Sequence, residues 1–325
     1  MGVKQMTIGV MTSGGDAPGM NAAIRAVVRT ACGYGHNVYG IRRGFMGLLE
    51  EDFVEMDAMS VSDIISRGGT ILYTSRCDEF RTLEGQQKAA DICRAHGIDG
   101  VVVIGGDGSF RGAEKLAEQG IRTIAVPGTI DLDIACTEYT IGFDTATSTA
   151  MEAADKIRDT SGSHERCSII EVMGRTAGHI ALWCSIANGS EYVLLPETFE
   201  ESEIDKVIAQ INSKRKIGKK HHIVVNAEGI GRSEEFAKRI EEGTGIETRA
   251  TILGHIQRGG SPTCRDRVYA SAMGSRAVDL LHQGQTSRVV AFCHGEFTDY
   301  SISAALEMQK SIDHSFETLL HKLSR

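Results

Sequence analysis

Short runs of β-branched residues recur along this chain, and each is followed by a glycine-rich turn and then by a helical pattern of apolar residues. Residues 7–12 (TIGVMT) precede the helical pattern of residues 19–31, and residues 100–105 (GVVVIG) precede that of residues 109–120. Strands that alternate with helices in this way are typical of parallel sheets with crossover helices. The pattern therefore predicts an α/β fold.

The same alternation continues towards the end of the sequence. Further strands are expected at residues 122–128, 167–172, 192–196, 222–229 and 288–293. Helical spacing fills the intervals at about 144–158, 175–187, 201–213, 233–241 and 265–282. No low-complexity linker separates these segments, and 325 residues suffice for two domains of roughly 100–200 residues each. We expect two domains that are interleaved rather than strung end to end.

Composition and charge exclude several classes of protein. The formal net charge of -8 provides no basic field of the kind that nucleic-acid binding uses. No window approaches the ~20 apolar residues of a membrane span, and the amino terminus has no basic region followed by an apolar core. The 8 cysteines form no Cys-x-x-Cys pair, which predicts free thiols in a reducing compartment. We expect a cytoplasmic protein that binds neither nucleic acid nor a membrane.

A first glycine-rich turn, TSGGDAPGMNAAIR (residues 12–25), follows a predicted strand and opens a predicted helix. The amides around Gly14 and Gly15 could point at an anion held at the helix amino terminus. The segment matches neither the dinucleotide-binding fingerprint nor the Walker loop. Ligand binding and a merely structural turn both remain open for it.

A second turn, IGGDGSF (residues 104–110), is more informative. Its glycines let a polyphosphate approach the backbone, Ser109 can cap the next helix, and Asp107 can hold the Mg²⁺ that accompanies a nucleotide. The alternative is that Asp107 is only a turn and capping residue. Because ligands of open α/β sheets sit at the carboxyl ends of strands, the pattern favours phosphate binding.

The segment PGTIDLDI (residues 127–134) places two carboxylates two positions apart in an otherwise apolar stretch. Pro, Gly, Thr and Asp all favour turns, so a turn is the simplest interpretation. If the segment is extended, Asp131 and Asp133 point to the same side and could address one centre. Phosphoryl transfer needs a metal and a carboxylate near the acceptor hydroxyl, and this pair could serve both needs.

Cationic side chains recur in or beside glycine-rich strand ends. They are Arg166, Arg175, Arg249 and Arg258, with His255. A lone arginine is usually a surface residue, but several in such turns indicate recognition of a phosphorylated substrate. Whether they converge stays open at the level of sequence.

A series of segments, in order and at matching spacing, resembles the bacterial ATP-dependent 6-phosphofructokinases. The segments are TSGGDAPGMNAAIR, RGGTILYTSRCDEF, VVIGGDGS, PGTIDLDI, TIGFDTA, IRDTSGSHER, EVMGR, AEG, ETRATILGHIQRGGSP and the DR of residues 266–267. The resemblance implies transfer of the ATP γ-phosphate to the 1-hydroxyl of fructose 6-phosphate, the committed step of glycolysis. It also implies a cytoplasmic homotetramer.

The implied fold is α/β, with two interleaved Rossmann-like three-layer domains whose sheets are mainly parallel. The larger, nucleotide-binding domain would comprise residues 1–142 plus about 257–308. The smaller, sugar-phosphate-binding domain would comprise residues 143–256 plus about 309–325.

The resemblance further implies roles for individual residues. Asp131 is implied as the catalytic base, with Thr129, Arg175 and Asp133 as groups beside the reacting phosphate or the metal. The implied contacts to ATP are Gly14, Arg76, Cys77, Gly106, Asp107, Gly108 and Ser109, with Asp107 as the Mg²⁺ ligand. The implied contacts to the sugar phosphate are Thr129, Asp131, Met173, Gly174, Arg175, Glu228, His255 and Arg258, together with Arg166 and Arg249 from a neighbouring subunit.

Four positions bear on the donor and on turnover. Pyrophosphate-dependent relatives typically carry Asp in place of Gly108 and Lys in place of Gly128, so two glycines favour ATP. Leu132 replaces the usual asparagine between the aspartates, and His179 replaces a usual aspartate. The alternatives are a kinase of this fold that uses pyrophosphate or tagatose 6-phosphate, and a catalytically weakened regulatory paralogue.

A further set matches positions that bind an ADP or phosphoenolpyruvate effector between subunits. The set is Arg25, Arg29, Arg158, Glu191, Lys219, Lys220 and His221. Asp52 and Ile217 fall where some members place a basic residue. We therefore expect an effector site that is present but weakened.

Overall fold

The structure, a computed structural model, describes residues 5–323 and divides the chain into two compact units. Unit 1 comprises Met1–Ile130, Ile134–Thr145 and Arg258–Lys310. Unit 2 comprises Asp131–Asp133, Ala146–Gln257 and Ser311–Arg325. Segments of the two units alternate along the sequence, and each unit has its own sheet. The predicted α/β class with interleaved units is confirmed.

Unit 1 is built on a seven-stranded sheet with the order β11-β10-β5-β4-β1-β2-β3. Its strands are β1 (Thr7–Thr12), β2 (Asn37–Ile41), β3 (Phe53–Met56), β4 (Gly100–Gly105), β5 (Arg122–Pro127), β10 (Arg288–Cys293) and β11 (Glu296–Ser301). Neighbouring strands are parallel except at the two edges, where β3 and β11 run antiparallel to β2 and β10. The sheet is therefore mainly parallel, as predicted.

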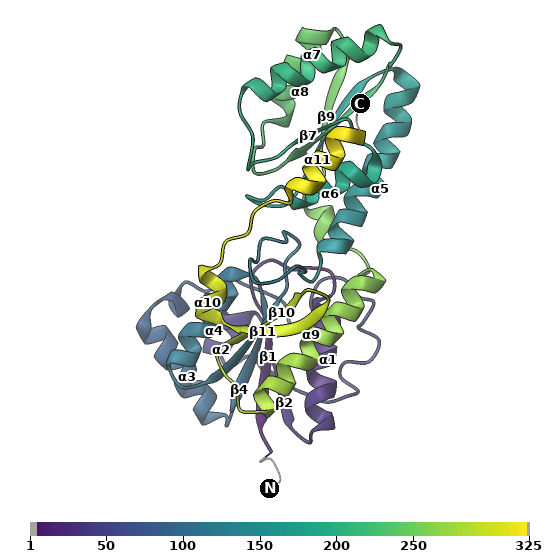
Figure 1. Cartoon of the computed structure of the whole chain (residues 1–325). Coiled ribbons are helices and arrows are strands. Elements are labelled where there is room, and N and C mark those ends of the chain that lie inside the picture. Colours follow the sequence, from purple (N-terminus) through teal and green to yellow (C-terminus); the bar gives the residue numbers. More distant parts are fainter. Residues whose placement is uncertain (1–4, 324–325) are drawn as a thin grey trace. The chain divides into compact units, whose positions relative to one another are not determined.

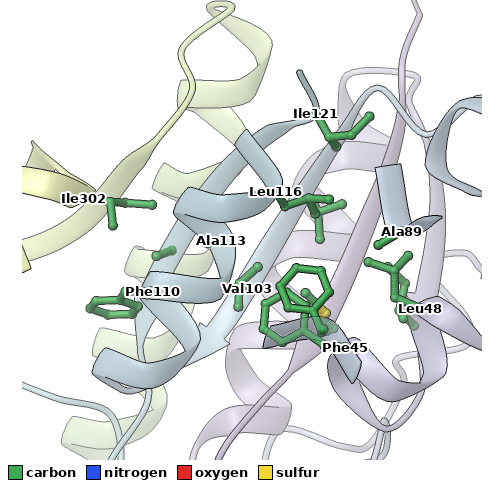
Figure 2. Packing of buried hydrophobic residues seen from close by; sticks show 14 of the residues in the cluster. Phe45, Leu48, Ala89, Val103, Phe110, Ala113, Leu116, Ile121 and Ile302 are labelled. Atoms are coloured by element: carbon green, nitrogen blue, oxygen red, sulfur yellow. The ribbon is translucent and has the colours of Figure 1, made fainter. Parts of the chain in front are cut away.

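Helices cover both faces of this sheet. On one face α1 (Met20–Gly33) and α9 (Cys264–His282) pack against each other (Figure 1). The other face carries α2 (Gly44–Leu49), the short helix η1 (Glu79–Arg81), α3 (Leu83–Ala95), α4 (Asp107–Glu118) and α10 (Ile302–Glu307). Figure 2 shows Phe110, Ala113 and Leu116 of α4 beside Phe45 and Val103 in one apolar cluster. This packing fixes α4 and, with it, the glycine-rich loop that precedes it.

Unit 2 has a four-stranded, fully parallel sheet with the order β7-β8-β6-β9. Its strands are β6 (Cys167–Val172), β7 (Tyr192–Leu194), β8 (His222–Ala227) and β9 (Thr248–Ile252). Helices α7 (Ser202–Lys216) and α8 (Ser233–Thr244) pack on one face through Ile204, Val207 and Phe236. The remaining elements are α5 (Phe143–His164), α6 (His179–Asn188), η2 (Gly254–Arg258) and α11 (His314–Leu323).

Two helices begin later than the sequence pattern suggests. Helix α1 begins at Met20, one residue after the start that the pattern indicates, and its N-cap Gly19 has a φ of 109°; that the amides around Gly14 and Gly15 point at an anion held there stays a prediction. Helix α6 begins at His179 rather than near residue 175, because Arg175 has a φ of 58° and cannot be helical. Within residues 5–323 no helix is long and apolar enough to cross a membrane, and the cysteines are free thiols.

Candidate functional site

The two glycine-rich loops of unit 1 meet at the carboxyl ends of β1 and β4. The amide of Ser13 donates to the carbonyl of Ile104 at 2.9 Å. A Cβ atom on Gly105 would lie 2.4 Å from both Ser109 Oγ and Ser13 O, so only glycine allows this approach. Ser109 Oγ also lies 3.5 Å from the place of a Cβ on Gly14. The structure thus brings Gly14 and Ser109 together.

Helix α4 begins at Asp107, with Gly106 as its N-cap and no side-chain capping bond. The prediction that Ser109 caps this helix is wrong, because Ser109 lies inside the first turn and is buried. The first turn presents amide groups and the positive end of the helix dipole, which favour an anion. Mg²⁺ is usually held by one or two carboxylates together with phosphate oxygens and water. A single carboxylate, Asp107, beside an amide-lined loop fits that requirement.

Of the two glycines that the sequence links to the choice of donor, only one faces open space. A Cβ atom on Gly108 would have no heavy atom within 4 Å. A Cβ atom on Gly128 would lie 3.0 Å from Ile104 Cγ2 and 3.1 Å from Met20 Cε. Gly128 therefore has a packing reason to be small, whereas Gly108 leaves room beside the loop.

Four further candidate residues of unit 1 lie near these loops. Thr74 Oγ1 donates to the carbonyl of Gly14 at 2.6 Å, which places the segment that contains Arg76 and Cys77 beside the first loop. Thr129 Cβ lies 3.9 Å from the place of a Cβ on Gly106. The guanidinium Nη1 of Arg258 donates to the carbonyl of Asp16 at 3.0 Å.

The segment Asp131–Asp133 groups with unit 2 and is not extended. Leu132 has a φ of 57°, in the left-handed region, so the prediction that the two carboxylates share one side of an extended segment is wrong. Asp131 is 5% exposed and Leu132 6%. A left-handed conformation costs a residue such as leucine about 1–2 kcal/mol but suits asparagine. The backbone thus gives a physical reason for the asparagine expected there from the resemblance.

The remaining candidate residues of unit 2 follow the strands β6, β8 and β9. Glu228 Oε1 accepts hydrogen bonds from the amides of Gly174 and Arg175. The side chains of Arg175 and His255 are exposed. Met173 is buried, and its amide donates to the side chain of Gln257, which the sequence interpretation gave no role.

Two of the four candidate arginines converge. Arg166 Nε donates to Glu247 Oε2 at 2.6 Å, and Arg249 Nε donates to Glu247 Oε1 at 2.8 Å. Hydrogen bonds from Arg166 and then Arg249 lower the pKa of the Glu247 carboxyl. The shared carboxylate Glu247, which the sequence interpretation also left without a role, holds the two guanidinium groups together.

The effector candidates divide between the units. Arg25 and Arg29 lie on α1 of unit 1, whereas Glu191, Arg158 and Lys219 form an ion-pair cluster in unit 2. Burial alone would raise the pKa of Glu191, but hydrogen bonds from Lys219 and from the Ile223 amide lower it. Within unit 2, Lys220 pairs with Glu165 at 2.6 Å, and His221 directly precedes β8.

The two positions that depart from a basic residue have different surroundings. Asp52 accepts hydrogen bonds from Arg43, whose Nη2 lies 3.0 Å from its Oδ2, and it also pairs with Arg42. Ile217 is 85% exposed and follows α7. Asp52 therefore has a structural function of its own, whereas nothing in the structure explains an isoleucine at position 217.

Beside this cluster, the first residue of β8 buries an ionisable side chain. His222 is 0% exposed, and among the described residues neither of its ring nitrogens has a hydrogen-bond partner. Burial lowers the pKa of His222 from 6.5 to about 4, although the nearby Glu191 carboxylate opposes the shift. The folded protein therefore holds this ring neutral.

This burial predicts a loss of stability in acid. The unfolded chain binds a proton at His222 below pH 6.5, but the folded chain does so only below about pH 4. The stability gained by keeping the His222 ring neutral is fully present above pH 6.5. About 3 kcal/mol of unfolding free energy is lost as the pH falls from 6.5 to about 4. His222→Phe should remove this loss in urea unfolding at pH 7.5 and 4.5. His294→Phe, at a side chain that is 95% exposed, is the control; equal pH dependence in both variants would contradict the prediction.

Unit 1, with amide-rich loops at the carboxyl ends of parallel strands, and unit 2, with arginine-bearing turns at such ends, define an α/β protein that binds phosphorylated ligands. Residues 7–281 match the family model described as Phosphofructokinase. The chain belongs to the phosphofructokinase family, as its segments predicted.

Individual relatives agree with this assignment. The chain is 57% identical over 319 residues to the ATP-dependent 6-phosphofructokinase of Clostridium botulinum (strain Loch Maree / Type A3), with 98% of this chain and 99% of the relative covered. It is 54% identical over 317 residues to that of Halalkalibacterium halodurans, with the same coverage. The crystal structure of Pichia pastoris phosphofructokinase in the T-state matches with a TM-score of 0.88 and 34% identity, over 98% of this chain and 40% of the longer yeast chain. The roles of single residues stay predictions.

Proposed function

We propose that the chain is an ATP-dependent 6-phosphofructokinase, which phosphorylates the 1-hydroxyl of fructose 6-phosphate in the committed step of glycolysis. The structural observation that carries the proposal is the meeting of Gly14 and Ser109 at the start of α4, where Asp107 lies. Identity to ATP-dependent relatives over nearly the full length supports it.

In this proposal the residues of unit 1 bind the nucleotide. The loop residues Gly14 and Gly106–Ser109, with Arg76 and Cys77, hold ATP and orient its phosphates. Asp107 would hold Mg²⁺, which when bound neutralises charge on the phosphates. Thr129, beside Gly106, lies near the transferred group.

The residues of unit 2 act on the acceptor. The Asp131 carboxylate takes the proton of the 1-hydroxyl as that oxygen bonds to the γ-phosphorus, and the bond to the leaving ADP oxygen breaks. The guanidinium of Arg175 stabilises charge on the transferred group. Asp133 supports this arrangement, and Met173, Gly174, Glu228 and His255 bind the sugar phosphate; Arg258, which groups with unit 1, is proposed for the same role.

An assay of product formation tests the proposal. The native chain should form fructose 1,6-bisphosphate from ATP and fructose 6-phosphate with Mg²⁺, and more slowly from pyrophosphate or with tagatose 6-phosphate. Faster turnover with pyrophosphate or tagatose 6-phosphate would establish the corresponding alternative. No turnover with any pair of substrates would favour a regulatory paralogue, disabled at Leu132 or His179.

The open space at Gly108 gives a prediction about the donor. Gly108→Asp should raise the KM for ATP roughly tenfold or more, because a carboxylate placed beside the phosphates repels them. Stability should not fall, since the Cβ meets no atom within 4 Å and an acidic residue suits the first turn of a helix. Steady-state kinetics and thermal unfolding measure the two effects.

Gly33→Asp is the matched control for this variant, because a Cβ on Gly33 also meets nothing within 4 Å. It adds the same charge at the carboxyl end of a helix, at the last residue of α1, and should leave the KM for ATP as it is. An unchanged KM in Gly108→Asp would show that this position does not face the phosphates of ATP.

Assembly and regulation complete the proposal. We propose a cytoplasmic homotetramer in which Arg166 and Arg249 act on a neighbouring subunit's substrate. An effector, ADP or phosphoenolpyruvate, would bind at Arg25, Arg29, Arg158, Glu191, Lys219, Lys220 and His221. Because Asp52 and Ile217 bring no positive charge, this site should be weak. Strong phosphoenolpyruvate inhibition that ADP reverses would contradict a weak site, and the mass in solution tests the tetramer.

A further inference from the structure

The turn that follows β6 has a strained backbone. Gly174 has a φ of 148°, and Arg175 has a φ of 58°, in the left-handed region. That region is unfavourable for a non-glycine residue, so it persists only where surrounding contacts over-determine it. A close approach also fixes the turn from outside, because a Cβ on Gly229 would lie 2.5 Å from the carbonyl oxygen of Arg175.

Two side chains accept hydrogen bonds from the consecutive amides of this turn. Gln257 Oε1 accepts from the Met173 amide at 2.8 Å. Glu228 Oε1 accepts from the Gly174 amide at 3.1 Å and from the Arg175 amide at 2.6 Å. The amide of Glu228 donates in turn to the carbonyl of Val172 at 2.9 Å. Each amide from 173 to 175 therefore has a side-chain acceptor.

Gln257 is buried, and both ends of its side-chain amide are hydrogen-bonded. It lies in η2 and is 0% exposed, and its Nε2 donates to the carbonyl of Ala146 at 3.5 Å. A buried amide group is costly unless both of its ends are bonded, so these two contacts define its orientation. An apolar side chain of this size would fill the same volume but could not accept from Met173.

We propose that Gln257 is a positioning residue for Arg175. It touches no reactant; it fixes the first amide of the turn, while Glu228 fixes the next two, and together they hold Arg175 in its left-handed conformation. The inference rests on the proposed function, in which Arg175 acts on the transferred group and Met173 and Gly174 contact the sugar phosphate. In this proposal Gln257 holds the conformation of the turn, and Arg175 makes the catalytic contact.

Gln257→Leu tests this role because leucine keeps most of the volume and removes the acceptor. We expect kcat to fall roughly 10- to 100-fold, since a small displacement of a catalytic group has effects of this size. The KM for ATP should stay unchanged, because the nucleotide loops belong to unit 1. Hydrogen exchange in peptides that span residues 173–175 should become faster. Gln283→Leu, the same change at an exposed position after α9, should alter none of these quantities.

A second variant serves if Gln257→Leu does not fold. Gln257→Glu keeps Oε1, and when protonated its hydroxyl can donate to Ala146 as the amide does. Burial favours the protonated carboxyl, so activity relative to the native protein should rise as the pH is lowered from 8 to 6. The proposal is overturned if the activity of Gln257→Glu relative to the native protein does not change with pH. It is also overturned if a folded Gln257→Leu protein has a kcat within twofold of native.

A double-mutant cycle separates positioning from general damage. If Gln257 acts through Arg175, Gln257→Leu should lower kcat little further when Arg175 is already alanine; full additivity would contradict the inference. Failure of the proposed function looks different. A native chain that does not phosphorylate fructose 6-phosphate would overturn that function, whereas hydrogen exchange at residues 173–175 would still report whether Gln257 holds the turn.

Discussion

Replacement of Asp266 by asparagine is expected to lower the free energy of unfolding by about 3–5 kcal/mol, because two of the four donors bonded to this buried carboxylate would lose their acceptor and face an amide donor instead. Asp266 is 0% exposed and lies in the first turn of α9. Its Oδ1 accepts from Tyr139 Oη at 2.6 Å and from the Gly142 amide at 2.7 Å. Its Oδ2 accepts from the amide and the hydroxyl of Thr145.

Two opposing effects, burial and hydrogen bonding, act on the pKa of the Asp266 carboxyl. Burial raises the pKa of the Asp266 carboxyl, while the hydrogen bonds from Thr145 and Tyr139 oppose the rise without cancelling it. A desolvated carboxylate of this kind is tolerated only while its donors stay in place. The cluster joins the start of α9 to Gly142 and the first turn of α5, so its loss should loosen both helix starts.

Chemical denaturation of matched variants measures the Asp266 effect. Asp266→Asn preserves the volume but turns an amide donor towards existing donors, so it should destabilise the protein about as much as Asp266→Ala does. Asp91→Asn, at an exposed pair with Arg94, is the control and should change stability by less than about 0.5 kcal/mol. A neutral Asp266→Asn combined with a costly Asp266→Ala would indicate packing alone and contradict the hydrogen-bond explanation.

The central strands could be predicted from the sequence because they are short, continuous apolar runs. β1, β4, β6 and β10 have the predicted bounds, and all of their residues are buried or half-buried. The edge strands β3, β9 and β11 and the strand β2 were not predicted. Their residues are partly exposed and interrupted by polar side chains, and their pairing is set by neighbours far away in the sequence.

The candidate site could be predicted in part, for a related reason. Parallel strands end at one edge of a sheet, and the sequence pattern placed glycine-rich turns directly after two such strands; the structure brings Gly14 and Ser109 of these turns together. Backbone angles in turns could not be predicted in this way. Leu132 and Arg175 are left-handed because tertiary contacts hold them, and neither residue type signals that conformation.

Residues whose role is to bind other residues of the protein were even harder to recognise from the sequence. Gln257 and Asp266 stood inside segments that resemble the family, but their spacing indicated no partner. Glutamine and aspartate are usually surface residues, and only their burial beside Met173 and Tyr139 shows what they bind. A polar residue whose function is to satisfy a buried amide or hydroxyl is recognised from its contacts, not from its type.

Replacement of Asp131 by asparagine is expected to lower kcat by roughly 10²- to 10⁴-fold, the range that loss of a general base produces. Asparagine has nearly the same shape but cannot take the proton of the 1-hydroxyl, so the KM for ATP and the thermal midpoint should change little. Coupled kinetics and thermal unfolding measure these quantities, and nucleotide binding by calorimetry shows that unit 1 is intact.

Asp159→Asn, at an exposed position on α5, is the matched control for Asp131→Asn and should keep native kcat. A structural role for Asp131 would lower stability together with activity, because the side chain is 5% exposed. A catalytic base would instead remove the acid limb from the pH profile of kcat in a protein of native stability. An Asp131→Asn protein that keeps kcat within threefold of native would remove Asp131 from the mechanism, and the base would then have to be sought at Asp133, across the left-handed Leu132.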